Sequence, residues 1–213
     1  MSTQSFGLGR FIGKRSPKRY LILWLALTCG TATAQINPPV RLRGTVESFA
    51  ARGLVIKERS GEVFTLLFPD ETGIVEVIPT DITIVQPGSF IGTATLPRAD
   101  GKLVALEVVV FPEAARGTGE GHFPWDLKPD SSMTNATVSN LARSSDGRTL
   151  SLRYKDGEKT VIVPDGIPVV TLRPGDRSLI VPGAKVFIVA EPVDDQLTVR
   201  RLMIGRKGLE PPM

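Results

Sequence analysis

The sequence predicts an all-β protein: two tandem small barrels of the OB or SH3-like kind, which come from an internal duplication and follow a signal peptide. Three observations carry this prediction. Apolar and polar residues alternate with a period of two in several short segments, and Gly-containing turn pairs separate those segments. The second half of the chain repeats the pattern of the first, and no segment after residue 35 keeps a helical period.

The first 34 residues have the composition of a secretory signal peptide. Five basic residues and no acidic one precede residue 20, an apolar run covers 20–30, and Ala32 and Ala34 form an Ala-x-Ala cleavage motif. The run is shorter than the roughly 20 apolar residues of a membrane-spanning helix. We therefore expect cleavage after Ala34, export to the periplasm or the medium, and no membrane span afterwards. The alternatives are an uncleaved anchor and lipidation at Cys29.

The charge of the chain argues against nucleic acid as a partner. The whole sequence has 26 Lys and Arg against 22 Asp and Glu, a net charge of +4, and five of the basic residues lie in the predicted signal. Residues 35–213 then hold 21 basic and 22 acidic side chains, without the basic excess that nucleic acid binding requires. Cys29, the only cysteine, also lies in the signal, so no disulfide or thiol chemistry is expected.

An internal repeat organises the rest of the chain. Three segments of the first half recur in the second half at an offset of about 92 to 96 positions: 44–69 in 136–164, 82–94 in 177–190, and 100–111 in 194–204. A near-constant offset over three segments indicates a duplication. The predicted organisation is a signal peptide (1–34), a first barrel (35–112), a linker (113–133), a second barrel (134–205) and a tail (206–213).

Each half reads as five or six short strands. Alternation is clear in 149–154, where Leu150, Leu152 and Tyr154 share one face, and again in 196–202. Turns are expected where glycine follows a small polar residue or proline, because glycine tolerates the positive φ of tight turns: Ser60-Gly61, Pro87-Gly88, Asp100-Gly101, Asp146-Gly147, Asp156-Gly157 and Pro182-Gly183. Asp194-Asp195 and Arg200-Arg201 are expected to be solvated charges at turns and strand ends. Closing the strands into barrels would remove exposed sheet edges.

The linker is the least regular stretch of the sequence. It contains the run GTGEGH (117–122), with the only histidine, and one of the two tryptophans, Trp125. Four of its side chains have the carboxylate or imidazole donors of a divalent-metal site: Glu113, Glu120, His122 and Asp126. Their spacing matches no established ligand pattern. The alternative is that His122 and Trp125 pack over the seam between the barrels.

We expect no enzymatic activity and no cofactor. A Ser–His–acid arrangement would have to use His122 with Ser131 or Ser132, and the sequence has no Gly-x-Ser-x-Gly elbow. The glycine-rich run of the linker lacks the Lys-Ser/Thr ending of a phosphate-binding loop.

Two functions fit these observations. The first is a non-enzymatic binding or structural module of the periplasm or cell envelope, with an envelope protein, a glycan or a small ligand as partner. Its site would be the barrel mouths or the seam under 113–133, near Phe90, Phe123 and Trp125. The second is a periplasmic accessory protein that binds a divalent metal through His122 and the nearby carboxylates.

Three phrases of the sequence suggest a family. FPEAARGTGEGHFPWDLKPDSSMTNATV (111–138), LRYKDGEKTVIVP (152–164) and GLEPPM (208–213) resemble a group of small exported alphaproteobacterial proteins with one or two copies of an uncharacterised β domain. The resemblance implies an exported, duplicated β domain without assigned catalytic or binding residues. Such proteins are often labelled "metal ABC transporter permease", but a permease needs several membrane spans and this sequence has one short apolar run.

Overall fold

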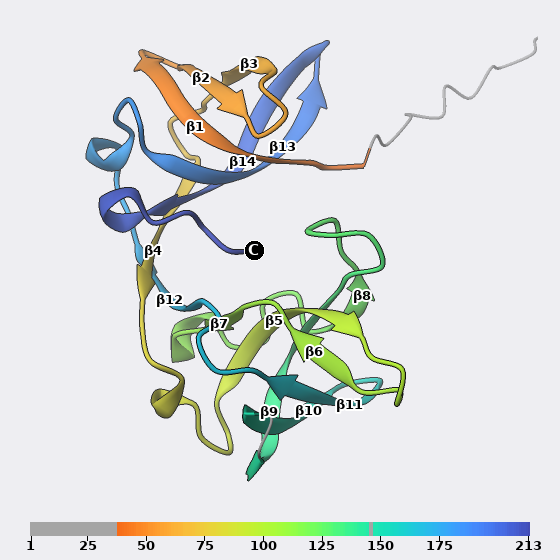
Figure 1. Ribbon diagram of the computed structural model, residues 1–213. Coiled ribbons are helices and arrows are strands. Elements are labelled where there is room, and N and C mark those ends of the chain that lie inside the picture. The colour runs from red at the N-terminus through yellow and green to blue at the C-terminus, as the bar shows by residue number, and fades with distance from the viewer. Residues whose placement is uncertain (1–37, 145–146) are drawn as a thin grey trace, which may run out of the picture. The chain divides into compact units, whose positions relative to one another are not determined.

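The computed structural model describes residues 38–144 and 147–213, and their secondary structure is almost entirely β (Figure 1). This part of the chain forms fourteen strands and four short 3-10 helices. None of its helices is long and apolar enough to cross a membrane. The predicted signal peptide and Asp146 of one predicted turn lie outside the described residues. The prediction of an all-β fold is confirmed.

One barrel is closed by strands from both ends of the described chain, and we call it the terminal barrel. Its strands are β1 (Val40–Ala50), β2 (Gly53–Glu58), β3 (Val63–Leu67), β13 (Lys185–Val193) and β14 (Gln196–Gly205). They pair in the order β1, β2, β3, β14, β13, and β13 returns to β1, so the ring closes. Its interior is filled by fully buried apolar side chains, among them Leu54, Ile56, Leu66, Phe68 and Leu202.

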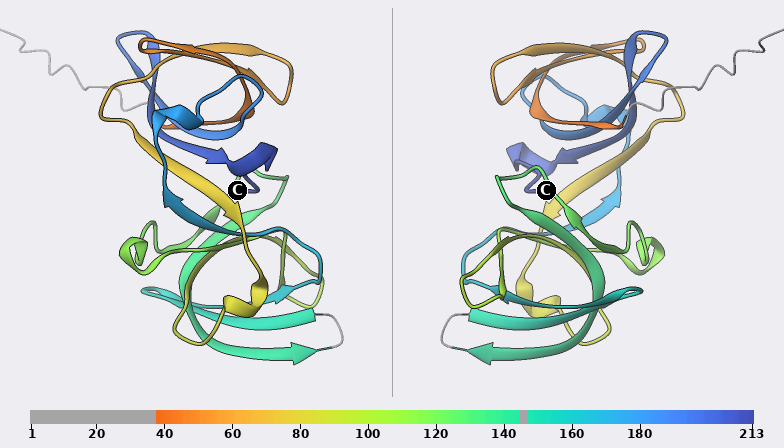
Figure 2. Two further views of the ribbon diagram at one scale, coloured as in Figure 1. Left: turned by 90° about the vertical axis from the view of Figure 1, so that its left-hand side faces the viewer. Right: turned by 90° about the vertical axis from the view of Figure 1, so that its right-hand side faces the viewer.

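The middle of the chain closes a second ring of five strands, the central barrel. It consists of β5 (Phe90–Pro97), β6 (Leu103–Ala105), β9 (Ser132–Ser144), β10 (Gly147–Tyr154) and β11 (Gly157–Val163). The pairing order is β5, β9, β10, β11, β6 and back to β5. Ile91, Leu150, Leu152 and Val161 are fully buried inside it. Figure 2 shows both rings from two sides.

The barrels do not coincide with the two sequence halves. The predicted boundaries placed one barrel in 35–112 and the other in 134–205, whereas each barrel takes three strands from one half and two from the other. The reason is that β4 (Gly73–Pro79) and β12 (Val169–Pro174) each carry the chain from one barrel into the other. They pair with each other on the way. Each barrel is therefore closed by strands from both sequence halves, an arrangement that we call strand exchange.

The register of the two halves corresponds despite the exchange. Gly44 of β1 lies opposite Val186 of β13. Ala136 of β9, 92 positions after Gly44, lies opposite Ile91 of β5, 95 positions before Val186. The ladder β1–β2 shifts register after Val46, and the ladder β9–β10 shifts at Val138. Strands β4 and β12, which connect the two barrels, form an antiparallel pair in which Val77 lies opposite Leu172.

Equivalent turns lead into the exchanged strands. The 3-10 helix η1 (Ile82–Ile84) is capped by the Asp81 carboxylate, which accepts a hydrogen bond from Thr83 N at 2.7 Å. Asp176 caps η3 (Arg177–Leu179) in the same way through Ser178 N at 2.8 Å. Gly88 and Gly183 follow with φ of 92° and 88°, so the predicted Pro-Gly turns are confirmed.

The predicted linker and tail are both ordered against the barrels. The linker begins with η2 (Glu113–Ala115) and contains β8 (Gly121–Pro124), which pairs with β9. A further short strand, β7 (Val108–Val110), joins β5 to β12. The tail starts with η4 (Arg206–Gly208) and folds back over Gly205, where a Cβ atom would overlap the Leu209 carbonyl oxygen. It ends between the two barrels (Figure 1).

Candidate functional site in the seam

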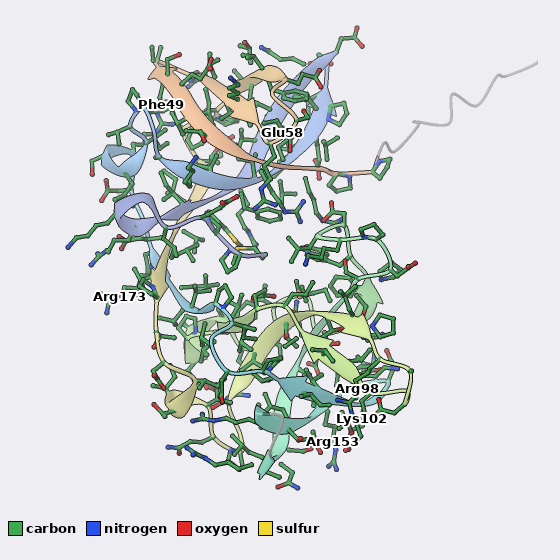
Figure 3. The ribbon with its side chains drawn as sticks, in the orientation of Figure 1. Phe49, Glu58, Arg98, Lys102, Arg153 and Arg173 are labelled. Atoms are coloured by element: carbon green, nitrogen blue, oxygen red, sulfur yellow. The ribbon has the colours of Figure 1, made fainter. Side chains whose placement is uncertain are left out.

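An apolar layer fills the seam between the terminal and central barrels. Its buried members come from both barrels, both crossing strands and the tail: Val77, Ala94, Val109, Met133, Val170, Leu172, Phe187 and Met213. Strand β5 shows why the layer exists, because its first six residues are all buried. One of its faces lines the central barrel and the other lines the seam. Figure 3 shows side chains occupying this space around the tail.

The seam layer borders a partly open cavity of about 180 Å³. Its wall is mainly apolar and is formed by Gly92, Val109, Phe111, Thr118, Gly119, Phe123, Trp125, Met133, Asn135, Leu172, Phe187, Val189, Arg201, Met203 and Met213. A hollow of about 330 Å³ adjoins it and shares five lining residues, Phe111, Thr118, Leu172, Arg201 and Met203. An apolar cavity of about 150 Å³ in another protein stays dry and binds benzene, so this space is large enough for a small ligand.

Equivalent positions of the two barrels carry different residues in the cavity wall. By the register of the halves, Gly92 of β5 corresponds to Phe187 of β13, and both line the cavity. A Cβ atom at Gly92 would lie 2.5 Å from Asn135 Oδ1 and 3.0 Å from Phe111 Cε2. The central barrel therefore keeps a residue without a side chain where the terminal barrel presents an aromatic ring.

Aromatic rings and methionines give the cavity its chemical character. Trp125 packs edge-on against Phe123 with 6.0 Å between ring centroids, and lies 6.2 Å from Phe187. Three methionines complete the wall, Met133, Met203 and Met213. Methionine side chains are flexible and polarisable, so a wall rich in them adapts to apolar ligands of different shape.

Two of the aromatic residues that sequence reasoning placed near a binding site, Phe123 and Trp125, line this cavity. The third, Phe90, stacks edge-on against Phe111 of the wall at 5.3 Å. The indole Nε1 of Trp125 is buried and has no acceptor in the described part of the chain. A buried donor without a partner is costly, and a ligand that supplied an acceptor would remove that cost.

Arg43 holds the tail in the seam. Its side chain is buried, its Nε donates to the Met213 main-chain oxygen at 2.9 Å, and its Nη2 donates to Asp126 Oδ1 at 2.6 Å. The guanidinium carbon of Arg41 lies 4.3 Å from the centroid of the Trp125 ring. Its Nη1 lies 3.7 Å from Asp126 Oδ2. The Asp126 carboxylate therefore neutralises two arginines beside the cavity.

The four predicted metal ligands are not brought together. Glu113 forms an ion pair with Arg116, and the Glu120 carboxylate accepts a hydrogen bond from Lys155 N at 3.1 Å. Asp126 binds Arg43, while His122 lies on β8 away from the cavity wall. Within 38–144 and 147–213, no group of three or more His, Cys, Asp and Glu residues is placed to hold a metal ion.

His122 has a packing role on the central barrel. Its Nδ1 lies 2.8 Å from Thr134 Oγ1, and its ring stacks on Tyr154 with 6.4 Å between centroids. Burial lowers the pKa of His122, and the charge of Lys159 lowers it further. The serines that a hydrolase would need have other contacts, since Ser131 donates to Trp125 O and Ser132 lies 3.0 Å from Thr95 Oγ1.

Sequence reasoning missed the buried carboxyl group of Glu107. The chain leaves the β5 ladder between β6 and β7, and there Glu107 Oε1 accepts a hydrogen bond from Ala94 N at 2.6 Å. Its Oε2 is buried without a partner among the described residues. Burial raises the pKa of Glu107 to about 8, against the opposing effect of the Ala94 hydrogen bond. The signal in the sequence was a single acid inside the apolar run 103–111.

A second hollow, of about 560 Å³, lies on the outside of the terminal barrel. It contains Glu76 and Arg206, which form a two-point ion pair with distances of 2.5 and 2.9 Å, and the hydrogen bond from Arg206 lowers the pKa of Glu76. Half-exposed Val181 forms another part of its wall. Lys207 adds a further positive charge to the wall. Because its described lining residues lack the aromatic and methionine side chains that line the seam cavity, this hollow is a weaker candidate for an apolar ligand.

Comparisons with known proteins add no relative. No family model matches the chain, and neither a curated protein nor a solved structure matches it. The resemblance to exported alphaproteobacterial β domains therefore stays a prediction, and any function has to be argued from the seam itself.

Proposed function

We propose that the protein is a non-enzymatic binding module of the periplasm or cell envelope that takes a small apolar or amphipathic ligand in the seam cavity. The observation that carries this proposal is the apolar cavity of about 180 Å³ walled by phenylalanine, tryptophan and methionine side chains. Small-molecule sites are mostly apolar concavities with a few polar groups for orientation, and this cavity has that composition.

The composition of the wall supports binding over catalysis. The fifteen lining residues include no His, Cys, Asp, Glu or Lys. General acid–base and nucleophilic catalysis rely mainly on such residues at hydrogen-bonding distance from the reacting atoms. The features that the wall does offer are apolar surface, aromatic faces and two amide- or guanidinium-bearing side chains, Asn135 and Arg201.

We infer further that the chain arose by internal duplication followed by strand exchange. The register correspondence at offsets of 92 and 95 positions supports this inference.

The test uses the intrinsic fluorescence of Trp125 in the full chain. Trp24 is changed to phenylalanine so that Trp125 is the only tryptophan, and the protein is titrated with octan-1-ol, a neutral apolar probe. We expect a saturable change in Trp125 emission and a higher melting temperature. A ligand at a hundredfold excess over its Kd stabilises the folded state by about 2.7 kcal/mol.

A cavity-filling variant provides the control. Val189→Phe places a ring in the cavity wall, and Val55→Phe enlarges an equally half-buried valine of β2 that does not line the cavity. Octan-1-ol should bind the Val55→Phe protein like the parent and should not bind the Val189→Phe protein. Equal binding to both variants, or no saturable binding to the parent, would contradict the proposal.

A further inference from the structure

We infer that the ligand of the seam cavity is a small amphipathic carboxylate, whose apolar part enters the cavity and whose carboxylate binds Arg201. This inference rests on the proposed function, which supplies the apolar cavity. It adds the charge of the ligand and the residue that recognises it.

Arg201 lies where the cavity meets the open hollow. It lines both, and its side chain is exposed. In the ladder between β13 and β14 it faces Val189, and Met203 follows two positions later. Alternate residues of a strand share a face, so Arg201 and Met203 project from the same face of β14, the one that forms the seam. A guanidinium there reaches from the apolar wall to solvent.

The Arg201 guanidinium makes no hydrogen bond or ion pair with the described residues, and the same holds for Arg173 in the outer hollow. Four other arginines near the seam are paired. Arg200 donates to Glu191 at 2.8 Å, and Arg206 binds both oxygens of Glu76. Arg41 and Arg43 share Asp126. Arg41, Arg43, Arg200 and Arg206 are thus held by protein carboxylates, whereas Arg201 on the cavity rim is available to a ligand.

The charges around the two hollows favour an anion. No Asp or Glu lines either of them, and Arg173 of β12 lines the outer one as well (labelled in Figure 3). Guanidinium groups bind carboxylates through two parallel hydrogen bonds, and such charge-assisted bonds are the strong ones. The unpartnered Trp125 Nε1–H adds a second donor in the wall of the cavity.

The volume restricts the apolar part of the ligand. About 180 Å³ accommodates a ring or a chain of medium length, which excludes a lipid with two long acyl chains from the cavity. Arg201 is the one charged side chain among the described residues that line this cavity, and its guanidinium matches one negative charge. A medium-chain fatty acid, or an aromatic carboxylate of similar size, meets both requirements.

The test compares octanoate with octan-1-ol, which share a chain of eight carbons and differ in charge. Binding to the full chain is measured by titration of Trp125 fluorescence in the Trp24→Phe protein at neutral pH. We expect octanoate to bind at least about tenfold more tightly than octan-1-ol, since hydrogen bonds to charged groups add about this factor or more. Arg201→Gln should lower the affinity for octanoate much more than the affinity for octan-1-ol, so that the advantage of octanoate is lost.

Two control variants separate recognition from folding. Arg200→Gln changes the neighbouring arginine and should leave both affinities unchanged, whereas Arg201→Lys keeps the charge and should retain part of the preference for octanoate. Saturable binding of octan-1-ol by the Arg201→Gln protein shows that its cavity is intact. If octan-1-ol binds and octanoate binds no better, or if Arg201→Gln lowers both affinities equally, the inference fails and the proposed function stands. If neither probe binds, both fail.

Discussion

At the scale of single residues, Glu107 is the side chain whose chemistry depends most on the fold. Its carboxyl group occupies a break in the β5 ladder and replaces a main-chain acceptor for Ala94 N. Taking a carboxylate out of water without a charged partner favours its neutral form. With its pKa raised to about 8, Glu107 is protonated in the folded protein at neutral pH and ionised in the unfolded chain.

This difference predicts that Glu107 makes the protein less stable as the pH rises. Between the unfolded pKa of about 4.3 and the folded pKa of about 8, the folded state holds a proton that the unfolded state does not. The free energy of unfolding then falls with pH, by at most about 1.4 kcal/mol per pH unit. The loss is complete above pH 8. Glu107→Gln should remove this slope and be more stable than the parent at pH 9.

Urea unfolding of both proteins at pH 5, 6.5, 8 and 9 measures the effect. Asp81 and Asp176 each cap a 3-10 helix, and their hydrogen bonds with Thr83 and Ser178 lower their pKa values. Because these contributions are common to the two proteins, the difference between the curves isolates Glu107. Parallel curves for parent and variant from pH 5 to 9 would refute the assignment.

At the scale of elements, the hairpin between β13 and β14 has a turn with unusual residues. Asp194 and Asp195 connect the strands, and both have positive φ, 47° and 61°. Two central residues with positive φ define a type I′ turn, which fits the twist of antiparallel strands and favours Asn-Gly or Asp-Gly. The sequence predicted these aspartates as turn charges, which is confirmed, but their backbone conformation was not evident.

Asp195→Gly is therefore expected to stabilise the protein, because glycine adopts positive φ without the steric penalty of a side chain. We expect the free energy of unfolding to rise by roughly 0.5 kcal/mol. Asp156→Gly is the matched control, because Asp156 also lies in a two-residue turn but has no positive φ. There the substitution should lower stability by a similar amount. The two changes are compared by urea unfolding, and the same sign in both would show that φ does not decide the outcome.

At the scale of the whole molecule, strand exchange predicts that residues 38–213 unfold as one unit. Each barrel is closed by strands from both halves, so neither barrel can open without disturbing strands that continue into the other. Independent barrels, as the linker at 113–133 first suggested, would unfold in two separate steps. The exchanged architecture is expected to show a single transition.

Core variants in each barrel test this cooperativity. Leu202→Ala in the terminal barrel and Leu150→Ala in the central barrel remove fully buried side chains, at a cost of about 2–5 kcal/mol each. Both should lower the midpoint of the same thermal transition, measured by circular dichroism and by Trp125 fluorescence. Val63→Ala, at an exposed position, should change the midpoint little. A second transition in either core variant would contradict a single cooperative unit.

Much of the local structure could be predicted from the sequence, because local structure depends on neighbouring residues. Alternation located the strand of Leu150 and Leu152, and the Pro-Gly pairs marked turns with the positive φ that glycine allows. Phe123 and Trp125 were singled out for the site because large aromatic side chains in an irregular linker need something to pack against. The four side chains predicted as metal ligands are close in sequence, but the described residues contain no group of three or more His, Cys, Asp and Glu side chains placed to hold a metal ion.

The choice of partner strands was decided only by the tertiary structure. Strands β5 and β13 occupy equivalent positions in the two halves, and the main-chain hydrogen bonds that join a strand to its neighbour are the same for any sequence. Residue pattern therefore cannot tell whether β1 pairs with β5 or with β13. The exchange also determined the site, because it sets Gly92 and Phe187 on facing walls of the seam with Arg201 at the rim. The sequence by itself determined the strands and turns, through local backbone preferences. The cavity followed from long-range pairing, which no short stretch of residues encodes.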